Sequence, residues 1–150
     1  MAGSDVSQYI DRSKRLLESS EMNEKNVEFK IIQPLIEILG WDLYMDVESE
    51  YTVQVGSKRY RVDYALSVGE APDIFVEAKS SSSNLNGEYQ DQLTSYMHQT
   101  GTDWGLLTNG NRFQILKLNV ESKLADNSVL AEFFIGDIEQ EHLSLANSSD

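Results

Sequence analysis

Three charged residues on two predicted strands have the types and the spacing of a hydrolytic site. One residue separates Glu77 from Lys79 in the run Ile-Phe-Val-Glu-Ala-Lys, and Asp63 lies near the end of the preceding predicted strand. Because side chains alternate along a strand, Glu77 and Lys79 should lie on the same side, and an adjacent antiparallel strand can bring Asp63 beside them. An apolar strand rarely carries unpaired charges, since burying them is costly. The pattern therefore predicts two carboxylates and one ammonium group that converge.

This set of groups is suited to phosphodiester hydrolysis. Two carboxylates and a main-chain carbonyl, here that of Ala78, are enough to hold a magnesium ion, which prefers hard oxygen ligands and keeps several waters. The ammonium of Lys79 could then orient the attacking water or stabilise charge developing on a phosphate. A simpler interpretation of Glu-x-Lys is a cross-strand ion pair near a sheet edge, and the short pattern by itself is weak evidence against it.

The composition restricts any metal site to oxygen ligands. The chain has no cysteine and only two histidines, His98 and His142, which excludes disulfides, a thiolate nucleophile, zinc sites built on sulfur and imidazole-rich sites. Oxygen ligands suit magnesium, calcium or manganese. The formal net charge of −13 exceeds the magnitude of about 2 to 8 that suits a small soluble domain. A solvated acidic face, adaptation to high salt and mimicry of a polyanion all remain open as explanations.

The length of 150 residues predicts one domain with one core. No apolar run approaches the roughly 18 residues of a membrane span, and the first ten residues lack the basic flank and apolar stretch of a signal peptide. We therefore expect a cytoplasmic protein without membrane contacts.

Hydrophobic periodicity predicts an α/β domain of α-β-β-β-α-β-β order. Helices are expected at 7–19, from Asn23 to the residue before Gly40, at 90–99 and at 137–145; strands are expected at 50–55, 60–66, 74–79, 104–108, 112–120 and 129–135. Pro34 lacks an N–H donor and should end or kink its helix locally. The serines at 80–83 are expected in a mobile loop, and the tail from Asn147 is expected to fray.

From about Asn23 to Leu118 the chain resembles the PD-(D/E)xK nuclease superfamily, and within it the amino-terminal nuclease domain of type I restriction enzyme R subunits and its stand-alone relatives. The resemblance rests on five blocks in order: NEKNVEFKIIQPLIEILGW, RVDYAL, IFVEAK, QLTSY and GLLTNGNRFQI. It implies a restriction-endonuclease-like fold, with an α-β-β-β-α-β core and a mixed central sheet flanked by helices. The expected domains are a helical extension at 1–22, the nuclease-like domain at 23–136, and a short helix and tail at 137–150.

The resemblance assigns Asp63, Glu77 and Lys79 to the metal-binding and catalytic motif. Gln92 and Tyr96 match the Gln-x-x-x-Tyr element that follows this motif in several branches. The two residues lie at i and i+4 of a predicted helix and so project the same way. We expect them to face the active cleft, the alternative being core packing of Tyr96 and exposure of Gln92.

A helix glutamate commonly completes such sites, and both Glu24 and Glu28 are candidates, one turn apart on the same face. We prefer Glu28, because it lies deeper in the apolar stripe that contains Val27 and Ile31, where an idle carboxylate would be costly. An exposed Glu24 is compatible with an ordinary solvated start of the helix.

The dipeptide Pro72-Asp73 imitates the name of the superfamily only four residues before Glu77. Along one strand that spacing places the two carboxylates roughly 13 Å apart at about 3.3 Å per residue, too far to share an ion. Asp63 is therefore the better partner for Glu77, and Asp73 is assigned to a turn.

The function that these features predict is a Mg²⁺-dependent, restriction-type DNA endonuclease, with Mn²⁺ as a substitute metal. Lys58, Arg59 and Arg61 form the densest basic cluster, which could contact phosphates or form a solvated hairpin tip. The expected partners are DNA and either other restriction-system subunits or a second copy of the chain. The alternative is a non-catalytic interaction module with a nuclease fold, or an acidic mimic of DNA.

Overall fold

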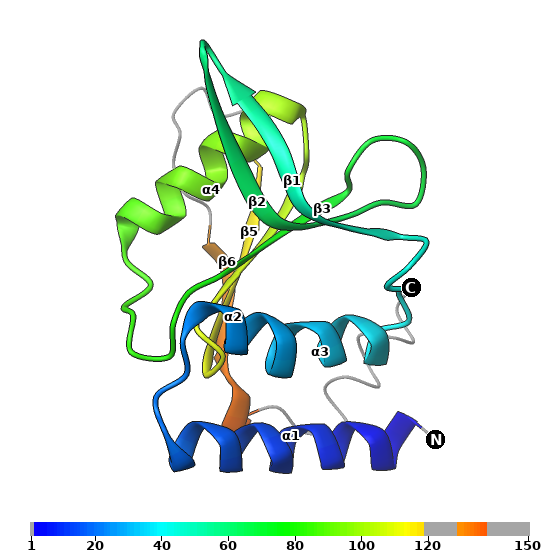
Figure 1. The fold of residues 1–150 in the computed structure, drawn as a ribbon, viewed down its shortest axis with the longest axis vertical. Helices are drawn as coiled ribbons and strands as arrows, with labels where there is room; N and C mark the ends of the chain where they lie inside the picture. The colour runs from blue at the N-terminus through cyan, green and yellow to red at the C-terminus, as the bar shows by residue number, and fades with distance from the viewer. Residues whose placement is uncertain (1, 119–128, 138–150) are drawn as a thin grey trace.

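The computed structural model describes residues 2–118 and 129–137 and shows one mixed sheet with helices on both faces (Figure 1). The helices are α1 (Ala2–Ser19), α2 (Glu24–Val27), the π-helix η1 (Glu28–Ile32), α3 (Gln33–Ile38), α4 (Gly87–Thr100) and the 3₁₀ turn η2 (Ile135–Asp137). The strands are β1 (Val47–Val55), β2 (Lys58–Leu66), β3 (Ile74–Ala78), β4 (Trp104–Thr108), β5 (Arg112–Lys117) and β6 (Val129–Phe134). The predicted α/β fold class, a mixed sheet flanked by helices, is confirmed.

The six strands are ordered β1-β2-β3-β4-β5-β6, and only β3 and β4 run parallel. Parallel neighbours need a long crossover, and α4 supplies it. The two hairpin turns that the sequence predicted, at Gly56-Ser57 and Asn109-Gly110, connect β1 to β2 and β4 to β5. In the second turn the Asn109 side chain accepts hydrogen bonds from the N–H groups of Asn111 and Arg112.

Two apolar clusters lie on opposite faces of the sheet. One contains Val6, Tyr9 and Ile10 of α1 together with the buried apolar residues of the helix at 24–38, and α1 lies against the outer side of α3 (Figure 1). These helix residues are Val27, Ile31, Ile32, Leu35 and Ile36. The other contains Leu93, Tyr96 and Met97 of α4. Both clusters are anchored by buried strand residues such as Val76 in the first and Phe75 in the second, as strand alternation requires. The sheet therefore has a helix-covered core on each side.

Residues 24–38 form one continuous helical rod that contains Pro34 without being ended by it. The side chain of Asn23 caps the start by accepting a hydrogen bond from the N–H of Asn26. The wide turn of η1 ends at Ile32, two residues before Pro34. Pro34 occupies the first turn of α3, where a missing donor is tolerated. Glu28 is the first residue of that wide turn. The local distortion that the proline predicted is thus a π-helical turn beside the candidate site.

Several elements differ in extent from the sequence prediction. The first helix begins at Ala2 rather than at residue 7, and β1 begins at Val47 rather than at residue 50. The serine loop is attached at both ends: Met22 and Ser81 exchange hydrogen bonds, and the Asn109 amide donates to the Ser83 carbonyl. The predicted helix at 137–145, the end of the strand predicted to reach residue 120 and the tail from Asn147 fall outside the described residues. Among the helices of the described ranges, none has the length and apolarity needed to cross a membrane.

The β1–β2 hairpin is twisted at Glu50 and Asp63. The ladder pairs Ser49 with Tyr64 and Tyr51 with Val62, so Glu50 and Asp63 face each other without being paired. Glu50 adopts a positive φ of 52°. On either side of this point the apolar residues face different cores: Val47 and Tyr64 pack with the N-terminal helices, whereas Tyr51 and Val62 pack with α4. A left-handed residue in β1 therefore marks the twist that positions Asp63.

This geometry predicts that Glu50→Gly leaves the free energy of unfolding unchanged or raises it. A non-glycine residue in a left-handed conformation is strained, and glycine removes the strain, while the exposed ion pair of Glu50 with Arg61 contributes little. Thr52→Gly, at a regular exposed position of the same strand, is the control and should lose about 1 kcal/mol. Urea unfolding measures both variants. An equal loss in the two would contradict a strained Glu50.

Candidate functional site

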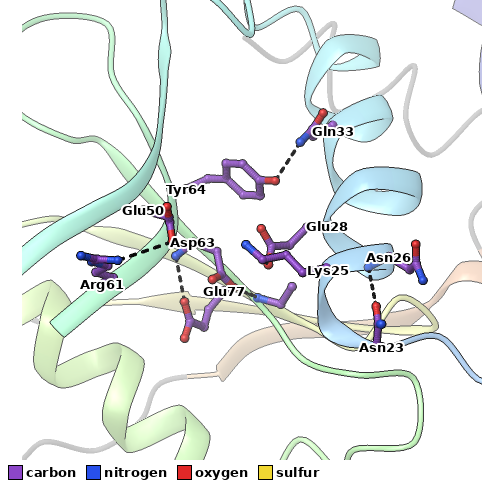
Figure 2. Close-up of polar contacts among 11 residues, drawn as sticks. Asn23, Lys25, Asn26, Glu28, Gln33, Glu50, Arg61, Asp63, Tyr64 and Glu77 are labelled. Atoms are coloured by element: carbon purple, nitrogen blue, oxygen red, sulfur yellow. Dashed lines mark hydrogen bonds and ion pairs between the residues drawn. The ribbon is translucent and has the colours of Figure 1, made fainter.

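The candidate site lies where β2 and β3 separate. Their ladder of main-chain hydrogen bonds ends at the pair Tyr64–Val76. One residue further along each strand, the side chains of Asp63 and Glu77 accept the hydrogen bonds instead. The N–H of Asp63 donates to Oε1 of Glu77 at 3.0 Å, and the N–H of Ala78 donates to Oδ2 of Asp63 at 2.8 Å (Figure 2). Each carboxylate is thus held by a main-chain N–H group at the divergence of the two strands. The N–H and C=O of one strand residue point to the same side, so the Ala78 carbonyl also faces this gap.

The structure also brings Lys79 to this point. Its Nζ lies 3.6 Å from Oε2 of Glu77, on the same side of the chain as the alternation predicted. The same ammonium lies 4.5 Å from the ring centroid of Tyr89 at the start of α4, within the range of a cation–π contact. The N–H of Lys79 donates to the carbonyl of Thr108 on β4. Lys79 is therefore positioned from three sides by β3, β4 and α4.

Both helix glutamates reach the same place. Glu24, Glu28 and Asp63 each offer a carboxylate oxygen, and these oxygens lie within 4.8 Å of one another. Glu24 is exposed, whereas Glu28 is buried and lies 3.9 Å from the ammonium of Lys25. Figure 2 shows Glu28 pointing from the helix toward Asp63 and Tyr64 on β2. The sequence left open whether Glu24 or Glu28 joins the site, and in the structure both lie in the group.

Glu77 lies outside that group of three, although it adjoins Asp63. Its two oxygens are engaged by the Asp63 N–H and by Lys79. The carboxylates converge from β2 and the helix, with the Glu77–Lys79 pair beside them. The expected convergence of Asp63 and Glu77 is thus observed, and a main-chain hydrogen bond joins the two residues in each direction.

The acidic groups of the site repel one another in a partly desolvated place. Burial is the main cause that raises the pKa of Glu77 to about 8, and the charge of Asp63 adds to it against the lowering effects of the Asp63 N–H and Lys79. Burial likewise raises the pKa of Asp63 and of Glu28, and in Glu28 the charge of Asp63 adds to the rise. A cluster of hard carboxylate oxygens whose charges destabilise one another fits a divalent cation such as magnesium.

Tyr64 and Gln33 belong to the surroundings of the site and were not identified from the sequence. The Gln33 amide donates to the Tyr64 hydroxyl at 2.9 Å, and this hydroxyl helps to lower the pKa of Glu28. Burial raises the pKa of Tyr64 itself to about 12, so the phenol stays protonated and able to donate. The available signal was a polar residue, Gln33, between the apolar residues Ile32 and Leu35.

The two helix residues of the Gln-x-x-x-Tyr element lie as in the alternative arrangement, with Tyr96 packed in the core and Gln92 exposed, rather than both facing the cleft. Tyr96 is 5% exposed and packs in the apolar cluster under α4, with its ring centroid 5.5 Å from that of Tyr60. Burial first, and then the charge of Glu77, raises the pKa of Tyr96 to about 12. Gln92 is exposed, and no contact joins it to the carboxylates within residues 2–118 and 129–137.

The remaining predicted residues lie where their elements require. Lys58 and Arg59 are exposed at the tip of the β1–β2 hairpin, and Arg61 lies 3.7 Å from Glu50. Asp73 forms the turn before β3, where its carboxylate accepts a hydrogen bond from the N–H of Val68 at 2.8 Å. The assignment of Asp73 to a turn is therefore confirmed.

The raised pKa of Glu77 predicts a pH-dependent stability of the protein in the presence of a chelator. Because the folded state holds the proton more tightly than the unfolded state, stability should be full below about pH 4.5 and should fall as the pH rises toward about 8. Glu77→Gln, which stays neutral, should flatten this decline in thermal melts between these pH values. Glu37→Gln, at an exposed position of α3, is the control and should keep the wild-type slope. Identical slopes in the wild type and Glu77→Gln would exclude a protonated Glu77.

Two solved structures share the fold with this chain. The first is a fragment assigned as an HsdR subunit of a type I restriction enzyme from Vibrio vulnificus YJ016, with a TM-score of 0.57 and 20% identity over 86% of this chain and 26% of that chain. The second is the cryo-electron-microscopy structure of a DrdV–DNA complex, with a TM-score of 0.62 and 14% identity over 97% of this chain and 13% of that chain. The chain thus spans about a quarter or less of either.

No curated protein matches the sequence. Residues 23–130, more than half of the chain, match the family described as the type I restriction enzyme R protein N terminus. This range begins at the cap of the long helix and includes every residue of the carboxylate site. The resemblance inferred from the five sequence blocks is confirmed, and the chain belongs to the family of type I restriction enzyme R protein N termini.

Proposed function

We propose that the protein is a metal-dependent DNA endonuclease of the restriction type, which hydrolyses phosphodiester bonds with an activated water. The observation that carries the proposal is the gathering of Glu24, Glu28 and Asp63 within 4.8 Å, beside the Glu77–Lys79 pair. These groups come from a helix and two strands, and bringing their like charges together lowers the stability of the fold. The family membership and the restriction-enzyme fold support this reading.

The metal in this proposal is Mg²⁺, with Mn²⁺ as a substitute. Asp63, Glu28 and Glu24 would hold it by carboxylate oxygens, with Glu77 and the Ala78 carbonyl at the edge of the site. When bound, such an ion lowers the pKa of a coordinated water and stabilises charge on the phosphate oxygens.

The side chains then divide the remaining work. Lys79 is the one cation held beside Glu77 in the described part of the chain, and its ammonium would orient the water or stabilise the developing negative charge. Glu77 holds Lys79 in place and, through the N–H of Asp63, fixes the strand that carries the other carboxylate. The ring of Tyr89 limits the directions that the ammonium can take.

DNA binding by so acidic a chain needs local cations. Lys58 and Arg59 at the hairpin tip are exposed, and in this proposal they contact phosphates. A net charge of −13 still opposes approach to DNA in dilute salt. We therefore propose that other subunits of a restriction system, or a second copy of the chain, contribute to DNA binding.

The acidity also favours a second candidate function, a non-catalytic interaction module or a mimic of DNA. Such a module needs surface acids only. A non-catalytic module would not require the buried Glu28 or the half-buried Lys79, which contacts residues of β3, β4 and α4. Both are costly, because burying a charge lowers stability. The cleavage assay decides between the two functions.

The proposal predicts DNA cleavage that requires a divalent metal and stops with a chelator. Asp63→Asn, Glu28→Gln and Lys79→Ala should each reduce the rate by at least about 100-fold, the usual loss for a group that stabilises charge in the transition state. The assay follows nicking and linearisation of supercoiled plasmid with Mg²⁺, Mn²⁺ or chelator.

Asp73→Asn is the matched control for this assay, because Asp73 belongs to the literal Pro-Asp dipeptide but only caps a turn. It should cleave like the wild type. Unchanged cleavage by Asp63→Asn and Lys79→Ala would reject the site, and inactivity of the wild type with every metal and DNA form would favour the non-catalytic module.

The Gln-x-x-x-Tyr element provides a separate prediction. We propose that the exposed Gln92 contacts the DNA strand, so Gln92→Ala should lower the cleavage rate without lowering the melting temperature, since it leaves no cavity. Gln99→Ala, exposed near the end of the same helix, should be silent. If Gln92→Ala is also silent, the residue has no part in DNA binding or catalysis.

A further inference from the structure

A cavity of about 420 Å³ adjoins the carboxylate group, on the side where the helix faces β1 and β2. It is lined by Lys25, Asn26, Glu28, Phe29, Gln33, Ser49, Glu50 and Tyr64. Its volume is within the roughly 300–1,000 Å³ typical of small-ligand sites. Because Glu28 belongs both to the cavity and to the carboxylate group, a ligand in the cavity would lie directly beside the proposed scissile phosphate.

Phe29 gives this cavity an aromatic wall. The side chain is 66% exposed, although its neighbours Glu28, Ile31 and Ile32 are buried. An exposed phenylalanine is not stabilised by the core. It offers a flat apolar surface of the kind on which unpaired bases stack.

Hydrogen-bond acceptors line the cavity from two elements, Gln33 from the helix that also carries Phe29 and Glu50 from β1. The Gln33 amide donates to Tyr64 from its nitrogen, and this orientation leaves its oxygen to accept. Glu50, held beside Asp63 by its left-handed backbone, adds a carboxylate. Carboxylate and amide oxygens accept hydrogen bonds from the exocyclic amino groups of cytosine, adenine and guanine, whereas thymine has no such group.

We propose that this cavity binds one unpaired nucleobase with an exocyclic amino group, adenine, cytosine or guanine, next to the phosphate that is cleaved. The inference rests on the proposed function and adds a substrate class to it, DNA with an unpaired or extruded base beside the cut. The base must be unpaired, because its ring face has to reach Phe29 and its amino edge has to reach Gln33 and Glu50. Lys25, at the rim of the cavity, is placed to contact a phosphate of the same strand.

The test measures binding of single-stranded oligonucleotides by fluorescence anisotropy, with calcium in place of magnesium and at one fixed ionic strength. Phe29→Ala should weaken binding by about 5- to 100-fold, the factor that corresponds to loss of one stacked base. Phe29→Trp should retain it. Tyr44→Ala removes another exposed aromatic side chain, outside the cavity, and should have no effect.

A scan of abasic positions makes the assignment specific. In the wild type one position should reproduce the loss seen with Phe29→Ala, and in Phe29→Ala an abasic residue at that position should cause no further loss. Adenine, cytosine or guanine there should bind more tightly than thymine, and Glu50→Ala should reduce this preference. Equal effects at all positions, additive losses, or no base preference would overturn the proposal, and so would unchanged binding by Phe29→Ala.

These outcomes are independent of catalysis. Binding that depends on Phe29, together with no cleavage of any DNA form with any metal, would favour the non-catalytic module and keep the base site. Cleavage that is unaffected by Phe29→Ala would reject the base site and keep the endonuclease.

Discussion

Two hydrogen bonds between side chains and the main chain hold the region on which the rest of the site depends. The Asp63 N–H donates to Glu77 and the Ala78 N–H donates to Asp63, at the point where β2 and β3 stop pairing. Without them the divergence of two strands would leave unsatisfied main-chain donors in a largely buried place. With them, the separation of the strands is compatible with a folded sheet, and both carboxylates are fixed by the backbone of the neighbouring strand.

The helix that faces these strands is deformed in a way that serves the same region. Pro34 has no main-chain N–H and so cannot donate a helical hydrogen bond. The π-helical turn before it begins at Glu28, whose carboxylate lies beside Asp63. On the sheet side, the left-handed Glu50 stands opposite Asp63. Irregular backbone thus lies beside the acidic group both in the helix and in β1. Strained backbone of this kind is common at functional sites.

The electrostatics of this region explain why it should respond to a cation. Burial and mutual repulsion raise the pKa values of Glu28, Asp63 and Glu77, so the ionised site is unfavourable by itself. A bound divalent ion would reverse that balance, and so would a proton, which links the stability of the fold to pH and to metal through the same side chains. Clustering these like charges costs stability, and the two apolar cores offset that cost.

The sequence by itself determined the fold class and the two-strand motif, because both follow from periodicities that local geometry imposes. Alternation placed Glu77 and Lys79 on one side, and the turn residues placed the hairpins, so β4 was predicted with its observed bounds and Asp73 was correctly assigned to a turn. The five ordered blocks sufficed to indicate the family. What the sequence left open, the contribution of Glu24 relative to Glu28, depends on how the helix packs against the sheet.

Only the tertiary structure decided the features that involve distant segments. The reciprocal bonds of Asp63 and Glu77 join residues 14 and 15 positions apart, and the link between Gln33 and Tyr64 spans 31 positions. The twist of the hairpin at Glu50 has no local sequence signal, since glutamate rarely adopts a positive φ. The cavity beside Phe29 has none either, because an isolated phenylalanine in a helix normally indicates a core position. Local pattern fixes which way a side chain points on its own element, but packing of the elements fixes which groups meet, and the chemistry of this site depends on that meeting.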